Sequence, residues 1–324
     1  MCVVAFGLTC FVLESRVRSK RLDTARYNAL ALTHRQVVNT KLRKKVPVLI
    51  DIPTREGLRS VGLGYLNLAW DNAMSLLSVA ANWGDASMDA DGATDAIRNH
   101  WLRAEREIAT CAILVHQGAE FLLKSRVAEI SPFLLLDSPG KIPAAATERD
   151  YPFDELKTID AQQLIRLHDV VRQEKLTELF VGLFEDLRKR RNRLVHGASA
   201  IGAGPESAIG IIKDILRICT ELLGRGSWPT IRRDHELGDP NAVWDYHGSI
   251  VASLIFEFNT AIAALSSEEC LRYLGFPAEA ERFNCPRCSR HDLYPDTPMA
   301  VSAEPTLRSV YCIVCGETSV LCDE

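Results

Sequence analysis

Apolar residues recur with helical spacing through the middle of the chain. The segment at 63–83 carries them at i, i+3, i+4 and i+7, which is typical of a helix that buries one face. We expect further helices over 96–130, from about 160 to 196, over 206–224 and over 246–265. Glycine, proline and aspartate interrupt the pattern, so GRGSWPTIRRDHELGDPN, residues 224–241, is interpreted as a loop. The chain is therefore predicted to be all-α, a bundle of about five helices.

The third of these helical regions combines an apolar face with a basic end. We expect Gly197 to end this helix, since glycine is common just after a helix C-terminus. The residues from Arg188 to Arg193 are basic except for Asn192, and His196 follows. The apolar positions predicted to share one face are Leu176, Leu179, Phe180, Leu183, Phe184 and Leu187.

The N-terminal segment, residues 1–57, has no visible chemistry, although KKVPVLIDIP could hold a short strand. Its apolar start, MCVVAFGLTCFVL, has no preceding basic region and is too short to span a bilayer. The run at 249–265 contains Glu257 and Asn259, which favours a core helix over a membrane span. We therefore expect a cytoplasmic protein that does not enter the membrane.

The composition is that of a globular protein. Of the 324 residues, 47% are hydrophobic and 25% are charged, and the formal net charge is −4 at pH 7. The basic run at 188–193 is therefore a local feature of a slightly acidic chain. Clustered positive charge can nevertheless bind phosphates.

Cysteine spacing near the C-terminus predicts a metal site. Cys285 with Cys288, and Cys312 with Cys315, form two CxxC pairs. Two such turns supply four thiolates to one tetrahedral ion and leave no open position, so structural zinc is expected. Residues 283–320 resemble a zinc ribbon, within a predicted domain at 280–324. His291 and Cys322 lie nearby as possible substitute ligands, and free or redox-active cysteines are the alternatives.

The basic helix end could carry acid–base chemistry. Asn192 and His196 are four residues apart and share one helix face. Arg191 lies about 140° around the axis from His196, so one helix alone does not aim both at one point. A two-fold dimer could bring Arg191 of one chain to His196 of another. Such a pair could cleave RNA without a metal, with the histidine transferring protons and the arginine holding the phosphodiester.

At this point the chain resembles a known family. RNRLVHG resembles the R-x4–6-H motif of HEPN domains, with a polar residue directly after the arginine. The segment at 116–130, HQGAEFLLKSRVAEI, resembles the second HEPN helix, and Glu120 falls where the family often has a glutamate. The number and order of the expected helices also fit. The resemblance implies a HEPN-like domain over 58–270 and a C-terminal zinc ribbon.

Many HEPN proteins are metal-independent endoribonucleases of toxin–antitoxin, CRISPR-linked or anti-phage defence systems, with sites at a dimer interface. The resemblance implies Arg191, Asn192 and His196 as catalytic residues, with no cofactor beyond structural zinc. It also implies a homodimer, an RNA substrate and an antitoxin or defence-complex partner. We expect the apolar face from Leu176 to Leu187, or helices beside it, to supply the dimer contact. The residues expected to contact RNA are Arg188, Lys189, Arg190 and Arg193.

Other interpretations of the same residues remain open. A basic run near a helix C-terminus is favoured by the helix dipole, and His196 followed by Gly197 could simply cap the helix. Some HEPN domains keep the fold without cleaving RNA. A non-catalytic nucleotide- or RNA-binding module, or a protein-interaction adaptor, is thus the alternative function.

Overall fold

The computed structural model describes residues 48–84, 90–138, 149–196, 202–238, 248–288, 298–304 and 309–320. All of them belong to one compact unit, Pro47–Glu324. Several predicted features lie outside the described residues, namely most of the N-terminal segment (1–47), Gly197, His291 and Cys322.

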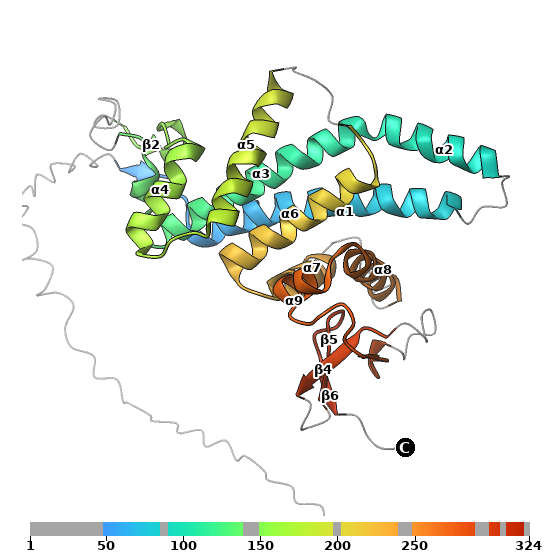
Figure 1. Ribbon diagram of the computed structural model, residues 1–324. Coiled ribbons are helices and arrows are strands. Elements are labelled where there is room, and N and C mark those ends of the chain that lie inside the picture. The colour runs from blue at the N-terminus through green and yellow to red at the C-terminus, as the bar shows by residue number, and fades with distance from the viewer. Residues whose placement is uncertain are drawn as a thin grey trace, which may run out of the picture. The chain divides into compact units, whose positions relative to one another are not determined.

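The described part of the chain is mostly helical, with a small sheet at its C-terminal end (Figure 1). This confirms the helical fold in outline, but the predicted number of helices was too low. Nine α-helices lie in the described ranges: α1 (Arg55–Gly84), α2 (Ala90–Arg103), α3 (Glu105–Ala128), α4 (Ala161–Arg172), α5 (Glu178–Val195), α6 (Pro205–Leu223), α7 (Ser227–Gly238), α8 (Gly248–Ala264) and α9 (Ser267–Tyr273).

Two of the expected helices are each divided. The region at 96–130 breaks at Ala104, whose N–H is shared between the carbonyls of His100 (3.0 Å) and Trp101 (3.2 Å). The region from 160 to 196 breaks after Gln173, which has a left-handed backbone (φ 54°). The Thr177 hydroxyl then accepts the N–H of Phe180 and starts α5 as its N-cap.

Helix α7 was predicted to be a loop, and this prediction was wrong. Pro229 is the third residue of the helix, where the N–H that proline lacks would have no helical partner. The helix is fixed from inside, since Trp228 and Arg232 are each 1% exposed. Helical spacing in so short a polar segment was hidden by Pro229, Asp234 and Gly238.

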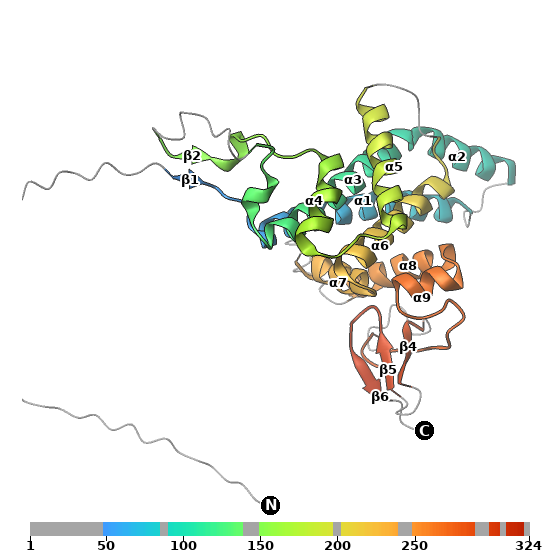
Figure 2. The ribbon, with the colours of Figure 1, turned by 60° about the vertical axis from the view of Figure 1, so that its left-hand side comes forward.

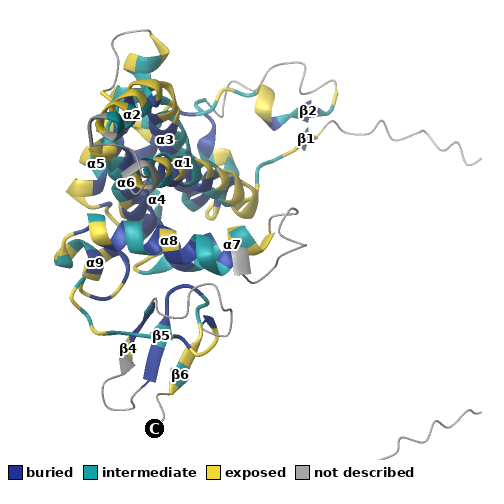
Figure 3. Cartoon of the chain, turned by 90° about the vertical axis from the view of Figure 1, so that its right-hand side faces the viewer, coloured by how far each residue is buried: buried dark blue, intermediate teal, exposed yellow. Residues whose placement is uncertain are grey.

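The packing of α1 against α3 organises the core. At their crossing, a Cβ on Gly62 would lie 3.0 Å from the carbonyl oxygen of Gly118, and a Cβ on Gly118 would meet Leu66 at 2.5 Å. Two glycines therefore allow this close approach. The largest buried side chains include Trp70, Leu122 and Phe258, and Figure 3 shows such buried positions on the inner faces of the helices.

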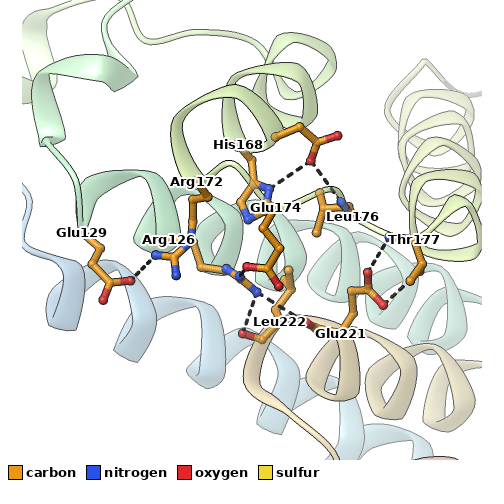
Figure 4. Close-up of polar contacts among 10 residues, drawn as sticks. Arg126, Glu129, His168, Arg172, Glu174, Leu176, Thr177, Glu221 and Leu222 are labelled. Atoms are coloured by element: carbon orange, nitrogen blue, oxygen red, sulfur yellow. Dashed lines mark hydrogen bonds and ion pairs between the residues drawn. The ribbon is translucent and has the colours of Figure 1, made fainter.

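A polar network holds the link between α4 and α5 (Figure 4). The Arg126 guanidinium pairs with Glu174 at 2.7 Å and donates to the Leu222 carbonyl at 3.3 Å. Glu221 accepts both the N–H (2.6 Å) and the hydroxyl (2.9 Å) of Thr177. These contacts fix the start of α5 against α3 and the end of α6.

Two small sheets complete the described structure. The strands β1 (Leu49–Ile50) and β2 (Tyr151–Pro152) pair in parallel, with Leu49 opposite Tyr151 (Figure 2). The strand β1 agrees with the short strand expected near the N-terminus. The C-terminal sheet is antiparallel in the order β3–β4–β5–β6, with bounds Arg282–Phe283, Ala300–Glu304, Ser309–Cys312 and Thr318–Val320.

Candidate functional site

The predicted catalytic residues lie at the C-terminal end of α5. The Arg191 guanidinium donates to the side-chain oxygen of Asn192 at 3.1 Å. His196 is exposed and caps the helix through its backbone, with its N–H donating to the Asn192 carbonyl at 3.0 Å. The His196 imidazole makes no hydrogen bond within the described residues. The structure thus joins Arg191 to Asn192 but leaves the His196 side chain on its own.

Three of the predicted RNA contacts are engaged by carboxylates of the same chain. Arg188 pairs with Glu185 at 2.9 Å and Lys189 lies 3.8 Å from Asp186. Arg190 lies 3.4 Å from Asp214, whose side chain is 7% exposed. Burial raises the pKa of Asp214, and the nearby Arg190 opposes that shift.

Arg193 differs from its neighbours in the basic run. It is exposed on the last turn of α5 and has no ion-pair partner in the described part of the chain. Glu120, which the resemblance had placed in the family pattern, pairs with Lys124 on its own helix at 2.7 Å. Of the four basic residues predicted to contact RNA, Arg193 therefore carries the most available charge.

The apolar face of α5 is used in the core. Phe180, Phe184 and Leu187 are at most 3% exposed, as the pattern predicted. Leu179 is the exception, since it is 74% exposed and lines a hollow of about 690 Å³ between α5, α6 and α9. The prediction that this face supplies a dimer contact is therefore wrong for its buried members.

A second hollow, of about 590 Å³, adjoins the motif end of α5 through Leu194. Arg103 and Arg106, from the junction of α2 and α3, line it together with Glu105 and Glu107. Both arginines are exposed, and neither has an ion-pair partner among the residues that the structure describes. Two unpaired arginines thus lie beside the motif on a neighbouring helix, together with the two carboxylates of the same hollow.

His116 is a residue that sequence reasoning missed. It lies on α3, is 1% exposed and stacks on Phe184 of α5, with ring centroids 5.4 Å apart. Neither ring nitrogen has a hydrogen-bond partner in the described part of the chain. Burial lowers its pKa, with Glu120 opposing the shift and Arg191 and Arg188 adding to it. The only sequence signal was a polar residue within an apolar stretch of α3.

We expect the histidine at 116 to make folding sensitive to mild acid. Its folded-state pKa is lowered, so as the pH falls below about 6.5 the unfolded chain binds a proton that the folded chain does not. Stability is therefore lost as the pH falls. His116→Leu should reduce this loss between about pH 7 and pH 5, and should raise the free energy of unfolding by about 1 kcal/mol at pH 7.5 by removing unpaired nitrogens. Urea titrations at both pH values measure this, with the exposed His235→Leu as control; an unchanged pH dependence would contradict it.

The cysteines of the predicted metal site are brought together. The ligand atoms of Cys285, Cys288, Cys312 and Cys315 all lie within 4.8 Å of one another. The sulfurs of Cys285 and Cys315 are 3.6 Å apart, and those of Cys288 and Cys312 are 3.8 Å apart. Four sulfurs at about 2.3 Å from one tetrahedral zinc ion lie about 3.8 Å from each other, so the spacing fits zinc. It is too long for a disulfide, and these cysteines are free.

Local contacts prepare this cluster for a metal. Hydrogen bonds from the thiols of Cys288 and Cys312 lower the pKa of Cys315, and the hydrogen bonds to Cys312 and Cys315 raise the pKa of Cys288, so the thiols share their protons within the cluster. Arg287, inside the first CxxC turn, pairs with Glu317, which follows the second. This ion pair links the two turns that carry the ligands. The described structure therefore places the four predicted ligands as a closed set.

A second group of ligand-type residues lies in the helical core and does not fit a cation. Asp71, Glu236 and Glu257 come together there, but the Arg232 guanidinium already lies among them, 2.7 Å from Asp71 and 2.9 Å from Glu257. Trp70 also donates to Glu257 at 2.8 Å. Burial raises the pKa of Asp71 and of Glu236. This cluster is a buried ion-pair network that joins α1, α7 and α8.

Among the described helices, none is both long and apolar enough to cross a membrane. Searches against protein-family models, curated proteins and solved structures find no match to this chain. The functional interpretation therefore depends on the residues themselves.

Proposed function

We propose that this chain is a metal-independent endoribonuclease of HEPN type, acting as a toxin or anti-phage effector restrained by an antitoxin or complex partner. The observation that supports the proposal is the His196 side chain, exposed at the end of α5 and without a partner in the described structure. A side chain that capped the helix would bond the last carbonyls, and this one does not. Its imidazole is accessible for proton transfer.

The chemistry requires a base, an acid and a cation. One imidazole takes the proton of an RNA 2′-hydroxyl, whose oxygen attacks the phosphorus. The bond to the 5′-oxygen then breaks, and that oxygen takes the proton back from the same imidazole, which is now protonated. Arg191 holds the phosphate and stabilises its charge, and Asn192 orients the guanidinium through the 3.1 Å hydrogen bond. The products are a 2′,3′-cyclic phosphate and a 5′-hydroxyl.

Arginines without an ion-pair partner in the described ranges lie on one side of the motif, and we place the RNA strand on that side. Arg193 on α5, and Arg103 and Arg106 beside Leu194, have no ion-pair partner in the described ranges. They could bind phosphates without first breaking an ion pair. Arg188 and Arg190 would have to leave the carboxylates that they now contact. We propose that RNA runs over Arg193 towards this hollow.

A homodimer completes the site in this proposal, by bringing Arg191 of one chain to His196 of the other. Because much of the Leu176–Leu187 face is buried within the chain, the contact must use other apolar groups. Val195 is 58% exposed and Leu102 is 69% exposed, on the motif turn and in the adjoining hollow. We propose that two copies meet there, so that Arg191 of one chain and His196 of the other together form one site.

Mixing two inactive variants tests this arrangement. Arg191→Ala and His196→Ala should each lack activity alone. In an equal mixture, half of the dimers combine both variants, and each of these holds one intact composite site. Activity should therefore return to about a quarter of the wild-type value after subunit exchange. Cleavage of a fluorescent RNA measures it, and a mixture as inactive as its components would contradict the shared site.

A further inference from the structure

Arg233 of α7 is a partly buried cation with an unused donor. Its side chain is 19% exposed, and its Nη1 atom is buried with no hydrogen-bond partner among the described residues. Its only ion-pair contact in the described structure joins Nε to Asp234 at 3.7 Å. A buried charged donor without a partner is destabilising, because it has lost its hydration. An anionic group close to Nη1 would therefore stabilise this guanidinium.

The Arg233 guanidinium lies directly on the second CxxC turn. A Cβ placed on Gly316 would lie 2.0 Å from Nη1 and 2.7 Å from Cζ of Arg233. Gly316 follows Cys315, has φ of 74° and donates its N–H to the Cys312 carbonyl at 2.8 Å. Glycine is required at this position for two reasons, namely the left-handed backbone and the close approach of the arginine. The result places a cation beside Gly316, the residue that directly follows the last predicted metal ligand.

A metal bound by four thiolates would supply the missing negative charge. Four thiolates and one Zn²⁺ carry a net charge of about −2, which the surroundings must compensate by hydrogen bonds or cations. Two other arginines that the structure describes near the cluster are engaged elsewhere. Arg287 pairs with Glu317, and Arg282 donates to Asn259 of α8 at 3.3 Å. Among the described arginines, Arg233 is the one near the cluster with a buried donor still free.

We propose that Arg233 is the counter-charge of the metal-bound cysteine cluster and holds the C-terminal sheet region on α7. The inference rests on metal binding by the four cysteines and is independent of the proposed ribonuclease activity. With the metal bound, the positive charge of Arg233 beside Gly316 would offset the negative charge of the thiolates. The neighbouring Arg232 anchors α7 in the helical core through its ion pairs with Asp71 and Glu257. The position of Arg233 on α7 is therefore fixed. Metal retention is thereby coupled to the helical part of the chain.

Zinc release from the full-length protein tests this. Arg233→Met keeps most of the side-chain volume and removes the charge, and Arg233→Lys keeps the charge. We expect Arg233→Met to release zinc to a chromogenic chelator about tenfold more readily than the wild type, as for other residues that support metal ligands. Arg233→Lys should recover part of that loss. Arg98→Met, which removes an exposed arginine paired with Asp95 on α2, is the matched control and should leave release unchanged.

Three results would overturn the proposal. The first is zinc release from Arg233→Met at the wild-type rate. The second is an equal loss in Arg233→Met and Arg233→Lys, which would assign the arginine to packing and not to charge. The cobalt-substituted protein gives an independent reading, because the thiolate-to-cobalt absorption band should change in Arg233→Met and remain in Arg98→Met. The same band unchanged in all variants would also contradict the proposal.

Discussion

Replacing Cys312 by alanine should abolish stoichiometric zinc binding. We expect the wild-type protein to carry about one zinc ion per chain. Structural zinc contributes on the order of 10 kcal/mol to the folding of small cysteine-rich units, so three thiolates should not hold the C-terminal sheet. The region at 282–320 should become sensitive to protease, while the helical circular dichroism signal remains. That signal should survive because Trp70, Leu122 and Phe258 form a core among the helices.

Cys111→Ala provides the matched control for the zinc prediction. Cys111 is fully buried on α3 and does not belong to the cluster. This variant should keep one zinc ion per chain, even though it loses some stability through the cavity that it creates. Metal analysis of protein purified without chelator measures both variants. A Cys312→Ala protein that retains a full zinc complement would show that the four cysteines are not one site.

Removing the imidazole of His196 should abolish RNA cleavage without unfolding the protein. General acid–base groups contribute roughly 10²–10⁴-fold, and the His196 side chain has no partner among the described residues. The melting temperature of His196→Ala should therefore stay within a few degrees of the wild type. Arg191→Ala should lose activity similarly, and Arg191→Lys should recover little of it because lysine cannot make a bidentate contact with the phosphate.

The exposed His235 on α7 supplies the control for the catalytic prediction. His235→Ala should cleave RNA at the wild-type rate, since α7 carries no residue of the motif. A non-catalytic binding module or adaptor predicts no cleavage in the wild type, so that no variant can lose it. Cleavage by His196→Ala at the wild-type rate would remove this histidine from the mechanism while leaving the fold unaffected.

The strongest sequence signals were those in which one side chain type repeats at a fixed spacing. The buried stripe of Phe180, Phe184 and Leu187 followed from helical periodicity, and the two CxxC pairs brought four sulfurs together. In both cases, local spacing determines which side chains share a face or a turn. The long apolar segments at α1 and α8 were found for the same reason.

Features that depend on tertiary contacts could not be found in this way. Helix α7 is short and polar, and it is held by Arg232 inside a carboxylate cluster assembled from α1, α7 and α8. Leu179 fits the apolar stripe by spacing but lies in a hollow. His116 becomes distinctive only when Phe184 and the arginines of α5 pack over it. Spacing along one helix cannot show what covers its face.

The available charge of the basic run also depends on contacts, because Arg188, Lys189 and Arg190 each lie beside a carboxylate. A basic run in sequence suggests a phosphate-binding surface, but its partners at Glu185 and Asp186 were one turn away on the same helix. Asp214 reaches Arg190 from α6, which no local pattern could reveal. The charges that remain available come partly from α2 and α3, through Arg103 and Arg106.

The most direct test of the account is the chemistry of the RNA ends produced by the wild-type protein and by His196→Ala in EDTA. A short incubation is needed, with metal analysis to show that the structural zinc stays bound. The account predicts that the wild type leaves 2′,3′-cyclic phosphate and 5′-hydroxyl ends and that His196→Ala leaves the RNA intact. Wild-type protein that retains its zinc and produces no cleavage, or that produces 5′-phosphate ends, would contradict it.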